Sequence, residues 1–421
     1  MPRDKVPRIG MSEPFHDLKG VATPATRSMG RLYWLALGTF AIGTEGFMIA
    51  PLLPDLARDL SVTLASAGQL VTVFALTYAL SSPILTALTG NVDRRRLLIA
   101  SMLAFAAANF IASSAHTYPA LLVARILLAV AAGLYVPNAN ALATAIVEPS
   151  RRGHALAIVT GGISVAVALG VPLGAVIGER FGWRVNFVIV GALSILATIG
   201  LLSGLPRDIA GGTPVASLRE RLDVARRPAI LLALLVTLLW ATGAYAVYTY
   251  LTPFLTQFAG ISRSSIGAVL FMWGVAAVLG IRLGGNLNDR FGNLPVILIS
   301  LSVLTIAFLS LAISPTFLPP HAARTPILLS IGLWGVSAWA FLPAQQARLV
   351  SIGGESVAPV TLSLNASFQF FGFSAGAALG ALTMGIGSPI WLGWVGACCE
   401  LCALVLVIAS RRPREDKEQS F

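Results

Sequence analysis

The chain has 421 residues, of which 56% are hydrophobic and 11% are charged, and its formal net charge is +11. The mean hydropathy is +0.81. A soluble protein of this length could not bury so much apolar surface, because the surface of a folded chain does not shrink fast enough with size. This composition excludes an ordinary soluble protein and indicates a membrane protein.

Twelve long apolar segments follow one another along the chain. A helix needs roughly 20 apolar residues to cross a bilayer, so each segment predicts one membrane-spanning helix and the chain an all-α membrane protein. The segments are 32–54, 65–88, 97–114, 119–147, 154–178, 185–205, 229–258, 265–287, 295–313, 324–350, 358–386 and 390–410.

Two charged residues interrupt these apolar segments. Glu45 lies near the middle of the first segment, and Arg125 lies about six residues, or about 9 Å, into the fourth. A charge in hydrocarbon costs at least about 2.5–3.5 kcal/mol, so each needs a reason. Glu45 can bind and release a proton, or it can be held permanently by hydroxyl groups or an arginine. Arg125 can stabilise Glu45 if helices one and four are neighbours, or it can be a structural arginine capped by carbonyl groups.

Other polar and aromatic residues predict a lined cavity. Asn365 and Gln369 are four residues apart and therefore share a helix face. A mixed amide and aromatic lining suits a neutral or cationic organic molecule. The alternative for each residue is an ordinary hydrogen bond between helices. The predicted cavity residues are Asn138, Asn140, Trp240, Tyr245, Tyr248, Asn365 and Gln369.

Glycine and proline are concentrated in the fifth and eleventh segments. The fifth contains Gly170, Pro172 and Gly174, and the eleventh has glycines at 372, 376, 380 and 385. Small residues four apart let helices pack closely and slide, and a proline within a span permits a kink. The pattern predicts a moving interface.

The chain contains an internal repeat. Pro54 and Pro253, and likewise Gly68 and Gly267, are separated by about 199 residues, and we expect each proline to end a helix. Duplication of six helices is typical of alternating-access transporters. We expect a tail at 1–31, a first half at 32–205, a linker at 206–228, a second half at 229–410 and a tail at 411–421.

Lysine and arginine residues are unevenly distributed between the loops on the two sides of the membrane. About 22 fall on one side and about 5 on the other, which places the basic side in the cytoplasm with both termini. We expect these residues to contact lipids rather than nucleic acid.

Loops other than the linker are short, so we expect no extramembrane catalytic module and no enzyme. Cys398, Cys399 and Cys402 have no spacing suited to a metal site.

These motifs together resemble the major facilitator superfamily, in particular its twelve-helix drug:proton antiporters and the arabinose and sugar-efflux permease branch. The sequence from Gly43 to Asp55 is similar to that branch's first helix, although only Glu45 is acidic. Arg125 followed by Gly133 matches the helix-four motif, whose arginine the resemblance implicates in proton coupling. The stretch Gly170–Gly174 resembles the antiporter motif of helix five, with Val171 inserted before Pro172.

The superfamily's loop motif is present in the second half as Gly285, Asp289, Arg290 and Gly292. In the first half it is degenerate, and only the basic run Arg94, Arg95 and Arg96 remains. We expect Asp289 to cap a neighbouring helix or to pair with an arginine across the cytoplasmic side, where the motif would act as a gate. Asp93 should be solvated.

The expected function is therefore secondary active transport in the inner (plasma) membrane. A monomer would export a small organic compound, such as a drug or sugar, in exchange for protons, with no cofactor because the proton gradient supplies the energy. No nucleotide-binding motif is present. A proton-coupled importer of the same fold and a non-transporting membrane sensor remain alternatives.

Overall fold

The computed structural model describes residues 24–205 and 217–410, with side chains from Gly30 onward. Within these ranges the chain is helical and contains no strand, and twelve helices are long and apolar enough to cross a membrane. Residues 1–23 of the predicted first tail and the whole predicted tail at 411–421 lie outside the described residues, as does the linker segment 206–216, whereas 24–31 belong to the first helix.

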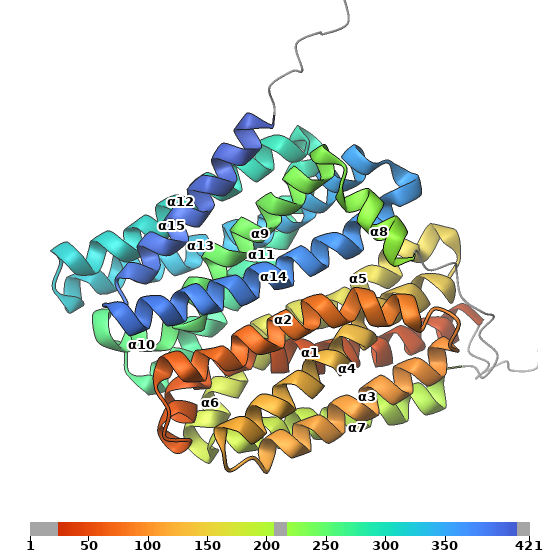
Figure 1. The fold of residues 1–421 in the computed structure, drawn as a ribbon, viewed down its shortest axis with the longest axis horizontal. Coiled ribbons are helices and arrows are strands. Elements are labelled where there is room, and N and C mark those ends of the chain that lie inside the picture. Colours follow the sequence, from red (N-terminus) through yellow and green to blue (C-terminus); the bar gives the residue numbers. More distant parts are fainter. Residues whose placement is uncertain (1–23, 206–216, 411–421) are drawn as a thin grey trace, which may run out of the picture.

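The helices form two lobes, which Figure 1 shows one above the other. The lower lobe is built of α1 (Pro24–Asp59), α2 (Leu64–Leu88), α3 (Arg94–Ser113), α4 (Tyr118–Ala145), α5 (Arg152–Val165), the π-helical turn η2 (Ala166–Gly170), α6 (Val171–Phe181) and α7 (Trp183–Gly204). The upper lobe is built of α9 (Pro228–Thr249), α10 (Leu251–Phe258), α11 (Arg263–Phe291), α12 (Asn293–Phe317), α13 (Pro320–Gly353), α14 (Ala358–Ile386) and α15 (Trp391–Ala409).

A short helix, α8 (Leu218–Ala225), lies in the second part of the linker. Ser217 and Glu220 form a capping box at its start, in which each side chain accepts a hydrogen bond from the other residue's backbone. Arg221 Nη1 donates to Ser363 Oγ of α14 at 2.6 Å, so α8 is anchored to the upper lobe. We call the end of the bundle that carries α8 and Arg94–Arg96 the basic end, and the other end the acidic end, after Asp55 and Asp59.

Two helix ends differ from the sequence predictions. Pro54 does not end the first helix, because α1 continues through Pro51 and Pro54 to Asp59. In the upper lobe the break falls at Tyr250, between α9 and α10, and Pro253 lies inside α10. A transmembrane helix tolerates proline where local adjustment and neighbouring groups satisfy the freed carbonyl.

The fifth span is one continuous helix with a π-helical turn in its middle. The turn η2 ends two residues before Pro172, which cannot donate a backbone hydrogen bond and crowds the carbonyl four residues earlier, within η2. Four of its glycines, at 162, 170, 174 and 178, face α1. A Cβ atom at Gly162 would lie 2.3 Å from the Ala36 carbonyl oxygen, and one at Gly170 would lie 2.2 Å from Thr44 Oγ1.

The glycines of α14 make the equivalent contact in the upper lobe. A Cβ atom at Gly372 or Gly376 would meet a backbone carbonyl oxygen of α9 at 2.5 or 2.3 Å. Both glycine-rich faces therefore pack within a lobe, and the moving interface stays a prediction. The lobes contact each other instead through α2 with α14 and through α5 and α6 with α11. Gly274 of α11, for example, packs against the backbone of Ala168.

Candidate functional site

A cavity of about 380 Å³ lies between the two lobes. Its walls come from α1, α2, α4, α5, α9, α11, α13 and α14, so both lobes contribute. Most of the wall is apolar and aromatic, and amide and hydroxyl groups interrupt it. The polar lining residues are Tyr78, Asn140, Thr160, Ser164, Tyr245, Gln346 and Gln369.

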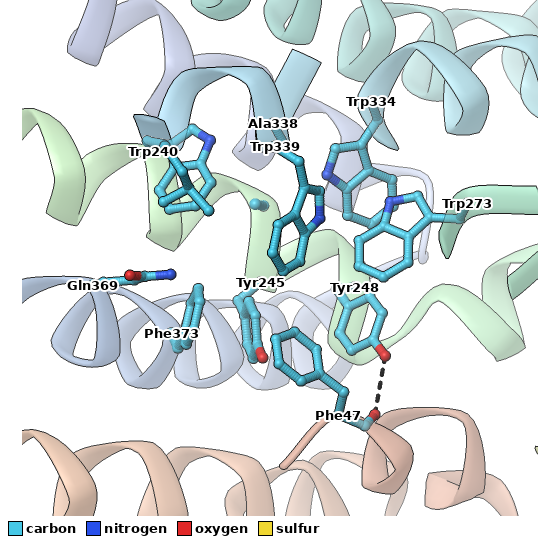
Figure 2. Close-up of a pocket in the computed structure, with 12 residues that line it drawn as sticks. Phe47, Trp240, Tyr245, Tyr248, Trp273, Trp334, Ala338, Trp339, Gln369 and Phe373 are labelled. Atoms are coloured by element: carbon cyan, nitrogen blue, oxygen red, sulfur yellow. Dashed lines mark hydrogen bonds between the residues drawn. The ribbon is translucent and has the colours of Figure 1, made fainter. Parts of the chain in front are cut away.

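A narrower aromatic recess of about 30 Å³ adjoins this cavity. Figure 2 shows that the ring of Phe47 reaches from the lower lobe toward a group of aromatic side chains of the upper lobe. The rings of Tyr245 and Phe373 are stacked, with centroids 3.7 Å apart. The aromatic residues of the recess are Phe47, Trp240, Tyr245, Tyr248, Trp273, Trp334, Trp339 and Phe373.

Three tryptophans of the recess carry indole N–H groups without a hydrogen-bond partner among the described residues. They are Trp240, Trp273 and Trp334, and each is less than 5% exposed. Buried N–H donors are normally paired, because an unpaired one loses its bond to water without compensation. The recess can therefore offer hydrogen bonds to acceptor atoms of a bound molecule.

The structure brings five of the seven predicted cavity residues together. Asn140 lines the cavity, Trp240 and Tyr248 line the recess, and Tyr245 and Gln369 line both. The amide of Gln369 lies beside the rings of Phe373 and Trp240 at one edge of Figure 2.

The structure places the other two predicted cavity residues outside the cavity wall. Asn138 Nδ2 donates to the Leu134 carbonyl one turn earlier in α4, at 2.7 Å. Asn365 Oδ1 accepts from Thr237 Oγ1 at 2.7 Å, which joins α14 to α9. Gln345 of α13 extends this contact by donating to Thr237 Oγ1 at 3.0 Å. Asn365 thus makes the hydrogen bond between helices that was its alternative, whereas Asn138 bonds within its own helix.

Glu45 and Arg125 form a fully buried ion pair. Arg125 Nη1 donates to Glu45 Oε1, and neither side chain has exposed surface. Arg125 Nε also donates to the Leu70 carbonyl of α2 at 3.1 Å, and its guanidinium lies 4.2 Å from the centre of the Phe74 ring. The arginine thus pairs with Glu45 and caps a carbonyl group at once, so both of its expected roles are present.

The ion pair lies directly behind the cavity wall. Gly43 and Gly46, on either side of Glu45 in α1, line the cavity, and so does Phe74, on which Arg125 stacks. Glu45 Oε2 and Arg125 Nη2 have no hydrogen-bond partner among the described residues. Each member of the pair can therefore accept one more interaction without breaking the existing one.

The lobes are joined at the acidic end. Arg263 of α11 forms an ion pair with Asp55 of α1, and Tyr248 Oη donates to the Phe47 carbonyl at 3.0 Å. Several polar lining residues, such as Asn140, Thr160 and Gln346, lie in the basic halves of their helices. The cavity therefore extends from the aromatic recess toward the basic end, while contacts between the lobes close the acidic end.

The loop motifs differ from the expectation at one point. Asp93, not Asp289, caps a helix: its Oδ1 accepts from the Arg96 backbone at the start of α3, at 2.8 Å. Asp93 directly precedes the first turn of α3, whereas Asp289 lies inside the last turn of α11. Asp289 is exposed, and its carboxylate has no ion pair within the described ranges.

The other residues of the two loop motifs do not share a single structural role. Arg95 donates to the carbonyls of Leu202 and Leu205 at 2.8 and 3.1 Å, which ties α3 to the end of α7. Gly292 has φ +78° where α11 turns into α12, a conformation that favours glycine. A Cβ atom at Gly285 would meet nothing within 4 Å, and Arg290 is exposed.

One buried carboxyl group was missed from the sequence. Glu400 lies in the middle of α15, and its side chain is completely buried. The signal was the same as for Glu45, an acidic residue within an apolar segment.

Comparison with known proteins agrees with this architecture. The sequence profile of the Major Facilitator Superfamily matches residues 35–350 and, in a second match, 253–421. The chain is 33% identical over 390 residues to the MFS-type transporter YbcL of Bacillus subtilis, covering 91% of this chain and 97% of that protein. It is 31% identical to the inner membrane transport protein YdhP of Escherichia coli K12, covering 91% and 96%.

Two further similarities are informative. A chloramphenicol resistance protein of Streptomyces lividans is 35% identical over 261 residues, which covers 62% of this chain and 67% of that protein. A bacterial homologue of the human lysosomal transporter Spinster has a crystal structure that superposes with a TM-score of 0.65 at 18% identity, covering 93% and 96%. The twelve membrane-spanning helices in two lobes, the central cavity and these matches show that the chain belongs to the major facilitator superfamily of membrane transporters.

Proposed function

We propose that this transporter exports a small aromatic organic compound in exchange for protons. The basic end would face the cytoplasm, with both termini, in the inner (plasma) membrane. The distribution of arginine and lysine favours this orientation. The relatives favour the location and the direction, since one is named an inner membrane transport protein and another a chloramphenicol resistance protein.

The observation that carries the proposal is the buried Glu45–Arg125 ion pair behind the cavity wall. Glu45 would carry the proton and Arg125 would tune its release. When Glu45 is protonated, it no longer balances the charge of Arg125, so the guanidinium must find another partner. Because Arg125 also contacts α2 through Leu70 and Phe74, a change at Glu45 would alter the packing of three helices that line the cavity.

The proposed cycle follows from the position of the pair. In the conformation described here the cavity extends to the basic end, so substrate would enter from the cytoplasm. Opening of the acidic end would then expose the substrate to the outside, where a proton would replace it. Each charge moved through the membrane potential supplies about 2.3 kcal/mol per 100 mV, which is enough to drive accumulation.

The recess favours one class of substrate. Rings of Tyr245, Phe373 and Trp339 offer stacking surfaces, and aromatic pairs contribute about 0.5–1.5 kcal/mol beyond the area that they bury. The unpaired N–H groups of Trp240, Trp273 and Trp334 offer donors only. A planar compound that carries carbonyl, nitro or ether oxygens would satisfy both kinds of group.

The test compares Glu45→Gln with the wild type after a resistance screen of a deletion strain has identified a substrate. In proteoliposomes, the variant should still bind that substrate, with a Kd that no longer depends on pH, because Gln keeps the shape but cannot ionise. It should not accumulate substrate when a pH gradient is imposed. Glu179→Gln, which changes an exposed carboxyl in α6, is the matched control and should transport normally. Gradient-driven transport by Glu45→Gln would eliminate Glu45 as the carrier, and uptake together with protons would indicate an importer.

A further inference from the structure

A second buried carboxyl group lies in the other lobe, far from the Glu45–Arg125 pair in sequence. Glu400 is the tenth of the nineteen residues of α15, about 13 Å from either end of that helix. It therefore lies near the middle of the membrane. Its side chain has no exposed surface, and no described residue donates a hydrogen bond to either of its carboxyl oxygens.

The helices around Glu400 supply no charge to balance it. The helices that pack closely on α15 are α9, α12 and α14, and none of them contains Asp, Glu, Lys, Arg or His. Arg348 of α13 does reach α15, but there it donates to Ser410 Oγ, about 15 Å along the helix from Glu400. The other titratable groups nearby are Cys399 and Cys402 of α15 and the tyrosines of α9, which are neutral in their ordinary forms.

A glycine on the facing helix makes room for the carboxyl group. A Cβ atom at Gly243 of α9 would lie 2.8 Å from Glu400 Oε1, so the carboxyl occupies the space of a missing side chain. Trp240 and Ala244, on either side of Gly243, line the aromatic recess. Glu400 is therefore separated from the recess by little more than the backbone of α9.

We propose that Glu400 is a second proton-binding site, which holds its proton in the conformation described here and exchanges it when α9 moves. The absence of a cation and of hydrogen-bond donors favours the neutral acid, because a buried carboxylate needs one or the other. Glu45 differs in this respect, since Arg125 compensates its charge. The two lobes would then carry two carboxyl groups in opposite charge states. As a role in transport, this inference rests on the proposed exchange of substrate for protons.

Infrared difference spectroscopy tests the site without any substrate, on the purified full-length protein in lipid. The wild type should show the carbonyl stretching band of a protonated carboxylic acid at neutral pH. That band should shift in D₂O and decline at alkaline pH. It should be absent from Glu400→Gln and should persist in Glu45→Gln. Glu400→Asp, which keeps a carboxylic acid at the same position, should show the carbonyl band at a shifted frequency. This variant tests the assignment even if Glu400→Gln does not fold.

A chemical probe gives an independent readout. Dicyclohexylcarbodiimide attacks protonated carboxyl groups in apolar surroundings, so peptide mass spectrometry should find its adduct on Glu400 in the wild type and in Glu45→Gln. Gly243→Ala, which crowds the carboxyl, should change the extent of labelling severalfold, whereas Gly332→Ala, in open space on α13, should not.

An infrared band or a labelling adduct that does not depend on Glu400 would overturn the proposal. A Glu400 band that neither shifts in D₂O nor declines at alkaline pH would also overturn it, because Glu400 would then be a permanently neutral structural acid. Failure of the Glu45→Gln transport test would leave these outcomes unchanged, so the two proposals can fail separately.

Discussion

Glu45 and Arg125 tolerate complete burial because each compensates the other. Removing two charges from water is costly, and their attraction repays the cost only when the geometry is good and other groups help. Here Leu70 and Phe74 supply that help to Arg125 through a carbonyl and a ring face. Removing one partner should therefore cost more than removing both.

We expect Arg125→Ala to destabilise the protein by about 3–5 kcal/mol, because it leaves Glu45 buried without a cation. The double variant Glu45→Gln with Arg125→Gln should recover most of this loss, since neither buried charge remains. Thermal unfolding in a mild detergent measures both. Arg58→Ala is the control: it breaks a pair with Asp55 at 3.7 Å in which the arginine side chain is 74% exposed, and it should cost under about 1 kcal/mol. A double variant no more stable than Arg125→Ala would show that the arginine acts mainly through Leu70 and Phe74.

Charged residues of the site could be predicted from the sequence, and most of its aromatic residues could not. A charge inside an apolar segment stands out because hydrocarbon penalises it, and this signal identified Glu45 and Arg125. It also marks Glu400. No such signal marks Phe47, Trp273 or Phe373, because an aromatic residue in an apolar helix can face lipid or a neighbouring helix at similar cost. Whether it lines a cavity depends on the rotation of the helix.

At the scale of single helices, the fifth span shows how small residues set the packing within a lobe. Gly161 and Gly162 are adjacent in sequence but lie in different surroundings. A Cβ atom at Gly162 would collide with the backbone and Thr39 side chain of α1, whereas one at Gly161 would meet nothing within 4 Å. The α1 backbone cannot move aside without displacing the whole turn, so the collision must be relieved by separating the helices.

We expect Gly162→Ala to destabilise the protein by about 1–3 kcal/mol or more, the usual cost of overpacking. Gly161→Ala should be neutral or stabilising by up to about 1 kcal/mol, because alanine favours the helix more than glycine does. The midpoint of thermal unfolding, measured for both variants in the same detergent, checks the difference. Equal midpoints would mean that α1 and α5 do not pack as closely as described.

The twelve spans could be predicted because each needs a long apolar segment, but their internal breaks could not. Pro172 marks the fifth span as irregular, yet the π-helical turn before it depends on how the surrounding helices accommodate an extra residue. The break at Tyr250 has no proline at its own position. The ring of Tyr250 packs where Gly68 of α2 and Gly380 of α14 lack side chains, a contact among three helices that no single segment reveals.

At the scale of the whole molecule, the two lobes meet through contacts that can separate. Ser374 Oγ of α14 donates to the Thr72 carbonyl of α2 at 3.0 Å, and the rings of Tyr78 and Phe370 stack with centroids 3.8 Å apart. These contacts flank the cavity, and the pair Asp55–Arg263 joins the lobes at the acidic end. Which lobe surfaces meet could not be predicted from the sequence, because two duplicated halves can rock against each other in more than one way.

Two acidic residues one turn apart in α1 allow the closure of the acidic end to be tested. Asp55 pairs with Arg263 across the lobes, whereas Asp59 pairs with Arg184 and accepts from Trp183 Nε1 at 3.0 Å within the lower lobe. Asp55→Asn should therefore weaken the closed acidic end, and Asp59→Asn should not. A partly exposed ion pair contributes up to about 1 kcal/mol, so the population of the open form should rise about fivefold.

Distances between spin labels at positions 179 and 317, in a background without the three cysteines, would measure this population by electron resonance. Both positions are exposed, and they lie at the acidic end on different lobes. Asp55→Asn should add a longer distance, and exchanging the charges with Asp55→Arg and Arg263→Asp should remove it again, because the attraction is restored with its direction reversed. Asp59→Asn should leave the distribution of the wild type unchanged. A longer distance in Asp59→Asn as well would mean that α1 itself had been disturbed. An unchanged distribution in Asp55→Asn would mean that Tyr248 and Tyr250 close the acidic end without the ion pair.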